Sequence, residues 1–117
     1  MNGLAYAKTK KFSIRIVRLY SFLRDEKREF VMSRQLLRSG TSIGANLAEA
    51  ECSISRAEFV SKIYIALKET METLYWLDLL HETDYLTDEQ HSSIRRDCDE
   101  LRKMMSSITK TMRGSHY

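Results

Sequence analysis

The chain has 117 residues and a formal net charge of +3, and it contains no proline and four glycines. A chain of this length forms one small domain, residues 1–117. Tight turns favour glycine and proline, and the long stretches 4–39 and 45–113 contain neither residue. Because sandwiches and barrels need several such turns, the composition excludes them and predicts an all-α domain.

The sequence also predicts the cellular compartment of the protein. No stretch approaches 18 consecutive apolar residues, and the opening residues precede Lys8, Lys10 and Lys11, which reverses the basic-then-apolar order of a secretory signal. We therefore expect a cytoplasmic protein with no membrane partner. Cys52 and Cys98 are isolated and lack Cys-x-x-Cys spacing, so we expect free buried thiols and no zinc or redox site.

Apolar residues at helical spacing predict a first helix over residues 8–24. They fall at steps of 4, 3, 1 and 3: Phe12, Ile16, Leu19, Tyr20 and Leu23. The charged run 25–29 shows no periodicity and is expected to be a connection.

A second helix is predicted over residues 33–51, where Leu36, Ile43 and Leu47 share one face. Beside them, Gly40 and Gly44 form a row of small residues with Ala48. Glycine costs up to about 1 kcal/mol in a helix interior, so this spacing indicates the close approach of another backbone.

Two capping-box patterns predict the remaining helices, 56–82 and 88–112, with a tail at 113–117. Ser55 precedes Glu58 by three residues, and Thr87 precedes Gln90 by three. Both helices carry a regular apolar stripe. Four helices with short connections predict an antiparallel up-down-up-down four-helix bundle.

The helix at 56–82 is apolar on more than its core stripe. Ile65, Trp76 and Leu79 cluster on roughly the opposite side. One explanation is that Trp76 packs sideways against a neighbouring helix of the same bundle. We favour the other, a homo-oligomer interface, because exposed apolar patches on soluble proteins usually mark interaction sites.

Charge is divided sharply along the sequence. Residues 1–38 hold ten basic and three acidic side chains, residues 39–93 hold three and ten, and residues 94–117 hold six and three. With the first and last helices adjacent, we expect one electropositive flank that binds RNA or DNA phosphates. The alternatives are a solvated face and electrostatic self-assembly. The candidate residues are Lys8, Lys10, Lys11, Arg15, Arg18, Arg102, Lys103 and Lys110.

A polar stripe follows the second helix, on the side away from its apolar residues. It consists of Arg38, Ser42, Asn46 and Glu49. Alone, such a stripe is typical of a solvated face. In an oligomer, the same groups could form a hydrogen-bonded seam between subunits.

Catalytic motifs are absent from the sequence, so we predict no enzymatic activity, no cofactor and no metal. The two sequence patterns most similar to a metal-binding motif are Asp78-x-x-His81 and Asp88-x-x-His91. Di-iron bundles use Glu-x-x-His at mid-bundle instead. No phosphate-binding glycine loop or nucleophile elbow occurs. His116 falls in the predicted tail.

The run Arg38-Ser39-Gly40-Thr41-Ser42-Ile43-Gly44-Ala45-Asn46, within residues 35–50, carries a family resemblance together with segments 55–59, 66–69, 72–77 and 84–86. These segments resemble the bacterial 23S rRNA intervening-sequence proteins, named for reading frames inside large-subunit rRNA genes. The resemblance implies an antiparallel four-helix bundle assembled as a homopentamer. It also carries the polar pattern over to Arg38, Ser42, Asn46 and Glu49, and the acidic positions of the third helix to Glu69 and Glu72.

Many relatives have proline in the first connection and at the position of Gly44, which this chain lacks. A structurally similar relative, the accessory variability protein of diversity-generating retroelements, is a basic pentamer that binds nucleic acid and a reverse transcriptase. We therefore expect a non-enzymatic homo-oligomer that binds RNA or DNA, with a nucleic-acid-processing protein as a further partner. The alternative is a protein-binding scaffold with no nucleic-acid role.

Overall fold

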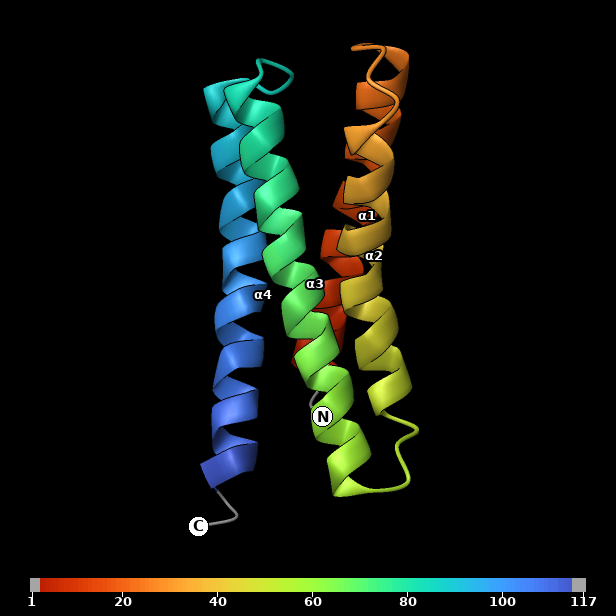
Figure 1. Ribbon diagram of the computed structural model, residues 1–117, viewed down its shortest axis with the longest axis vertical. Helices are drawn as coiled ribbons and strands as arrows, with labels where there is room; N and C mark the ends of the chain where they lie inside the picture. The colour runs from red at the N-terminus through yellow and green to blue at the C-terminus, as the bar shows by residue number, and fades with distance from the viewer. Residues whose placement is uncertain (1–2, 115–117) are drawn as a thin grey trace.

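The computed structural model describes residues 3–114 as four helices packed into an elongated bundle of 48 × 22 × 22 Å. They are α1 (Gly3–Asp25), α2 (Met32–Ala50), α3 (Arg56–Glu82) and α4 (Asp88–Gly114). Consecutive helices lie side by side, and the connections between them alternate between the two ends of the molecule (Figure 1). The predicted four-helix bundle is confirmed.

Two helix ends differ from the prediction by two residues or more, and the others agree within one residue. α1 begins at Gly3 rather than residue 8, and α4 continues to Gly114, so the first two residues of the predicted tail are helical. Ala5 and Thr9 are buried, which explains the earlier start of α1: its first turns pack against the bundle. Residues 115–117, with His116, lie outside the described residues.

Both predicted N-caps form, and the pairing is fully reciprocal at the second. The Glu58 amide donates to Ser55 Oγ (3.0 Å), and the Glu58 carboxylate accepts from the Ile54 amide (3.2 Å). At α4 the pairing is reciprocal, since the Gln90 amide donates to Thr87 Oγ1 (3.1 Å) and the Thr87 amide to Gln90 Oε1 (2.9 Å). These caps satisfy backbone donors that the first turn leaves free.

The start of α2 depends on a cap that the sequence analysis missed. Glu29 is buried, and its carboxylate accepts from the amides of Val31 (3.2 Å), Met32 (3.1 Å) and Ser33 (2.7 Å). Arg28 turns the chain into this position with a φ of 55°, in the left-handed region. The charged run 25–29 is therefore an ordered cap rather than only a connection.

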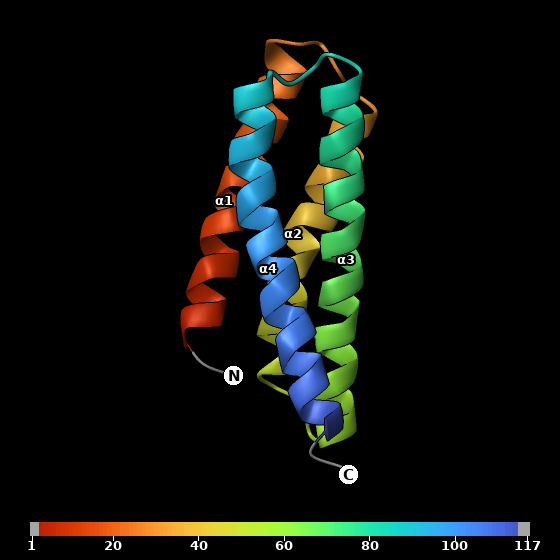
Figure 2. The same cartoon turned by 90° about the vertical axis from the view of Figure 1, so that its left-hand side faces the viewer.

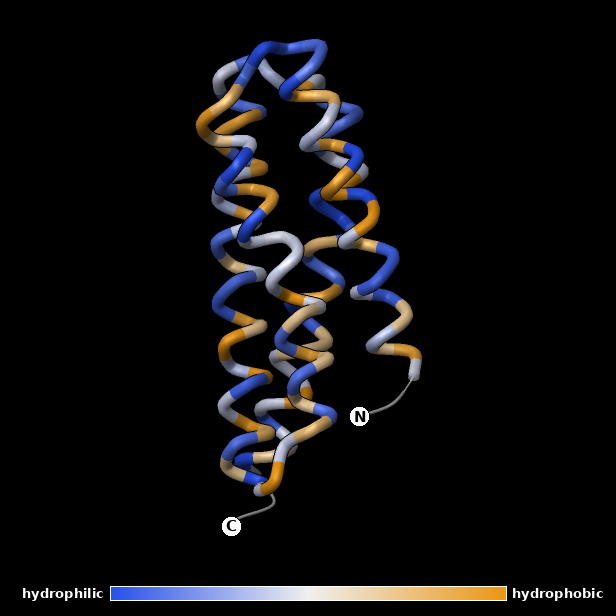
Figure 3. The backbone as a smooth tube through the Cα atoms, turned by 90° about the vertical axis from the view of Figure 1, so that its right-hand side faces the viewer, coloured by the Kyte–Doolittle hydropathy of each residue, from blue (hydrophilic) through white to orange (hydrophobic). Residues whose placement is uncertain are grey.

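The core runs the length of the bundle and draws apolar side chains from every helix. Apolar and polar residues alternate along the turns of the backbone (Figure 3), as expected for helices that bury one face. None of the helices within residues 3–114 is long and apolar enough to cross a membrane. The largest fully buried apolar side chains are Ile16, Leu23, Leu36, Ile43, Leu47, Ile63, Leu77, Leu80, Leu101 and Met105.

The two interior glycines lie where α1 approaches α2. A Cβ atom on Gly40 would lie 2.8 Å from both γ carbons of Ile16, and one on Gly44 would lie 3.2 Å from Ser13 Oγ. The predicted close approach of a backbone is seen at Gly44, whose added Cβ would lie 3.7 Å from the Thr9 backbone oxygen. At Gly40 the close neighbour is the Ile16 side chain. By contrast, α1 packs less closely against α4, from which it diverges towards its N-terminus (Figure 2).

Candidate functional site

The seam between α1 and α4 contains acidic as well as basic side chains. Arg15 Nη1 lies 2.7 Å from Asp97 Oδ2, and Arg15 Nη2 donates to Ser93 Oγ (3.1 Å). Lys8 forms an ion pair with Glu100. Because α4 presents these two carboxylates to α1, the predicted electropositive flank is not continuous: Lys8 and Arg15 are partly neutralised within the chain.

The other predicted cations separate into two groups. Lys10, Lys11 and Arg18 are exposed on α1, and no carboxylate of the described residues lies within ion-pair distance of them. On α4, Arg102 Nε and Lys103 Nζ lie 2.7 and 3.5 Å from the two oxygens of one residue, Asp99.

Sequence reasoning missed one exposed basic residue of α4, Arg96. Lys110 is exposed and has no carboxylate partner within residues 3–114, and the same holds for Arg96. Arg96, Lys103 and Lys110 recur every seven residues, so they share one outward face of α4. This spacing was the signal that could have identified Arg96.

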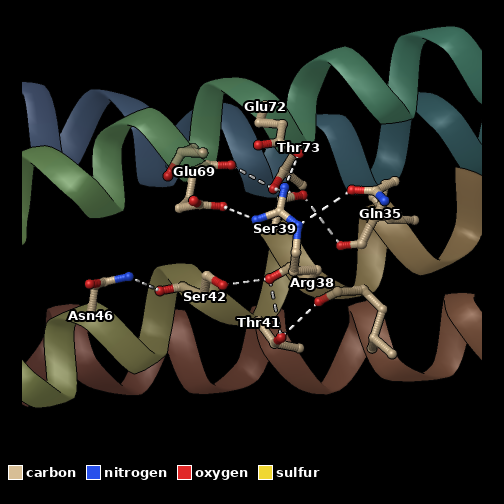
Figure 4. Close-up of polar contacts among 12 residues, drawn as sticks. Gln35, Arg38, Ser39, Thr41, Ser42, Asn46, Glu69, Glu72 and Thr73 are labelled. Carbon is tan, nitrogen blue, oxygen red and sulfur yellow. Dashed lines mark hydrogen bonds and ion pairs between the residues drawn. The ribbon is translucent and has the colours of Figure 1, made fainter.

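The predicted polar stripe on α2 faces α3 of the same chain (Figure 4). Arg38 Nη1 lies 3.3 Å from Glu69 Oε2, and its Nη2 forms an ion pair with Glu72. Trp76 Nε1 also donates to Glu72 Oε2 (2.9 Å). Hydrogen bonds from Arg38 and Trp76 favour the charged carboxylate and hold the pKa of Glu72 below its usual range.

The rest of the stripe is also satisfied within the chain. Ser42 Oγ donates to Arg38 O (2.6 Å), and Asn46 Nδ2 donates to Ser42 O (2.8 Å). Glu49 accepts from Lys62 Nζ on α3 (2.9 Å). The structure thus brings the stripe and Glu69 and Glu72 together as a seam between two helices of one bundle.

The apolar residues of α3 that lie outside its core stripe differ in how exposed they are. Trp76 is half-buried and packs against the core beside α2, as in the first of the two explanations. Leu79 is half-buried and Ile65 is 37% exposed. The most exposed apolar side chains of α3 are instead Met71 and Tyr75, which the sequence analysis did not single out.

The two His-containing patterns meet at the α3–α4 turn, but they pair across it. His91 Nε2 lies 2.8 Å from Asp78 Oδ1 and His81 Nε2 lies 2.6 Å from Asp88 Oδ1, with the two imidazole rings stacked at 4.0 Å. Arg95 Nε also contacts Asp78 (3.0 Å). Within residues 3–114, no three His, Cys, Asp or Glu side chains are grouped so that they could bind a metal ion.

The prediction of two buried thiols is correct for one cysteine only. Cys98 is buried, and burial raises the pKa of its thiol to about 12. Cys52 is exposed, because it lies in the connection between α2 and α3 rather than on a core-facing turn.

Replacing Arg38 by Gln should raise the pKa of Glu72 towards its usual value, because the charged partner is lost. In the wild type the lowered pKa stabilises the fold above the unfolded value of about 4.3, and this contribution disappears as the pH falls through the lowered pKa. The difference in the free energy of unfolding between wild type and R38Q should therefore be largest near neutral pH and should decrease below about pH 4. Because the pair is exposed, the difference should be at most about 1 kcal/mol.

An NMR titration of the Glu72 carboxyl, with urea unfolding at several pH values, measures both effects. The control is Lys62→Gln, which removes the other α2–α3 ion pair and leaves Glu72 untouched. An unchanged Glu72 titration in R38Q would contradict the assignment.

The helices, their shared core and the intrachain seams define a small four-helix bundle protein. The chain matches the model of the 23S rRNA-intervening sequence protein family over residues 2–107 and belongs to that family. This confirms the resemblance seen in residues 35–50 and in α3.

A similar solved structure is a protein of unknown function from the S23 ribosomal protein family of Bacteroides thetaiotaomicron VPI-5482. It is 56% identical, with a TM-score of 0.90, and the match covers 91% of this chain and 98% of that one. No curated protein matches the chain significantly.

Proposed function

We propose that this protein is a non-enzymatic, cytoplasmic homo-oligomer that binds RNA or another nucleic acid through basic side chains of α1 and α4. The observation that carries the proposal is that several exposed cations of α1 and α4 lack a carboxylate partner among residues 3–114; they include Lys10, Lys11, Arg18, Arg96 and Lys110. Clustered cations of this kind bind phosphates irrespective of sequence.

Self-association is supported by exposed apolar side chains on two helices that are not adjacent in the bundle. Ile14 and Val17 of α1 are 44% and 46% exposed, and Ile65 of α3 is 37% exposed. The family resemblance suggests a pentamer, in which each subunit would repeat the same basic surface. Clustering cations in this way would strengthen binding to a long polyanion.

Binding to duplex RNA or DNA should weaken steeply with salt, with a log–log slope of about −0.9 for each phosphate contact. Lys11 and Arg18 lie seven residues apart on one face of α1, so the double variant Lys11→Glu/Arg18→Glu should flatten the slope by about 2 and weaken binding to all sequences alike. Fluorescence anisotropy over a salt series measures this. Lys27→Glu, a single charge reversal in the α1–α2 connection, is the control, and each single variant of Lys11 and Arg18 is compared with it.

The absence of wild-type binding at about 50 mM salt would favour the alternative, a protein-binding scaffold. A double variant with the wild-type slope would place the contact elsewhere. Sedimentation at micromolar concentration tests the assembly, and a monomer would contradict the homo-oligomer.

A further inference from the structure

A second surface of the bundle combines aromatic and basic side chains. On α3, Tyr75 and Met71 are 59% and 52% exposed, which is unusual for side chains of their size. Figure 2 shows α3 and α4 side by side, and two cations of α4 contact α3 on this side: Arg113 lies over the Tyr64 ring, and Arg95 contacts Asp78. We call this surface the α3/α4 face; it consists of Tyr64, Met71, Tyr75, Arg95, Arg102 and Arg113.

The α3 residues of this face follow one side of the helix, and contacts with α4 fix their position against it. Residues 64, 68, 71 and 75 recur at steps of 4, 3 and 4, which places Lys68 on the same side of α3 as the two tyrosines. Two contacts fix the register with α4: the Arg113 guanidinium lies 5.8 Å from the Tyr64 ring centre, and Arg95 contacts Asp78, three residues beyond Tyr75. From Tyr64 to Tyr75 the stripe spans about 16 Å.

The α3/α4 face retains positive charge after its ion pairs are formed. Two carboxylates contact its cations, Asp78 with Arg95 and Asp99 with Arg102 and Lys103, and neither of them pairs with Arg113. Lys68 has no carboxylate within ion-pair distance in the described part of the chain. The stripe of aromatic rings is therefore bordered by an excess of cations.

From these observations we infer that the α3/α4 face binds single-stranded nucleic acid, with a base stacked on the exposed ring of Tyr75 and phosphates on the neighbouring cations. The inference rests on the proposed function and specifies the form of nucleic acid. An exposed aromatic ring beside cations suits unpaired bases, whose faces are free, whereas a duplex buries the faces of its bases. A second copy is a poorer occupant, because it would have to bury the charges of Lys68 and Arg113.

The test compares a labelled oligouridylate of about 20 nucleotides with an RNA duplex of the same length, by fluorescence anisotropy at about 50 mM salt. Tyr75→Ala should weaken oligouridylate binding about tenfold, the effect of losing one stacked base, and leave duplex binding unchanged. Tyr75→Phe keeps the ring and should bind as the wild type does. Ile54→Ala, at an exposed residue in the α2–α3 connection, is the control.

Three results would overturn the inference, and they can be told apart. If the wild type binds both probes and Tyr75→Ala binds oligouridylate equally well, this inference fails and the proposed function stands. If the wild type binds neither probe, this inference and the proposed function both fail. If Tyr75→Ala loses affinity and also sediments as a smaller species than the wild type, the face is an interface between copies.

Discussion

Replacing Gly40 by Val should lower the free energy of unfolding by about 3 kcal/mol, the upper part of the range for overpacked cores. The added Cβ would lie 2.8 Å from both γ carbons of Ile16. These carbons are bonded directly to the branched Cβ of a fully buried side chain, so they cannot turn away. α1 and α2 must separate instead. Urea unfolding at one fixed protein concentration measures the loss, since self-association would shift the midpoint.

Two further variants test this explanation. Gly44→Ala should raise stability by about 0.5 kcal/mol, because alanine favours the helix and the closest atom to its Cβ is Ser13 Oγ, which can rotate; the two Thr9 atoms at 3.7 Å are at ordinary contact distance. Ile16→Ala should partly restore Gly40→Val, since the valine then fills the space that the isoleucine leaves. A G40V protein with the wild-type midpoint would show that the two helices do not approach this closely.

Replacing Glu29 by Ala should cost about 2 kcal/mol and loosen the first turn of α2. The buried carboxylate accepts from three backbone amides, and without it these donors lose their partner in a site that water reaches poorly. Urea unfolding measures the stability, and amide hydrogen exchange at Val31, Met32 and Ser33 should accelerate in the variant.

The controls for this variant come from the same connection. Glu29→Gln keeps an acceptor oxygen and should cost about half as much, because the helix N-terminus also favours the negative charge that is lost. Glu26 is exposed, and Glu26→Ala should leave stability and exchange unchanged. Equal exchange rates in Glu29→Ala and the wild type would refute the capping role.

Sequence reasoning predicted best where the interaction is local. The capping boxes at Ser55 and Thr87 and the core stripes of all four helices depend on residues three or four positions apart, which a single chain shows directly. Glu29 was missed because an isolated glutamate before a helix does not match the usual cap residues. Its role depends on the left-handed turn at Arg28, which no periodicity reveals.

The candidate site was less predictable, because it depends on which residues face each other across helices. Counting charges along the sequence placed ten cations in residues 1–38, but it could not show that Asp97 and Glu100 turn towards Arg15 and Lys8. The polar stripe of α2 was likewise identified as a unit, and its partners on α3 were left open. The contact between Arg38 and Glu69 shows that the stripe has partners on α3 of the same chain.

The sequence by itself therefore determined the helices, the bundle, the family and the excess of positive charge, because periodicity, caps and composition act over a few residues. Only the tertiary structure decided which basic side chains form ion pairs within the chain and which remain available to bind phosphates. Ion pairs form between helices that are distant in sequence, and their distances depend on packing, such as the close approach at Gly40. Packing also left Met71 and Tyr75 exposed on α3, which the apolar and charged stripes in the sequence had not indicated.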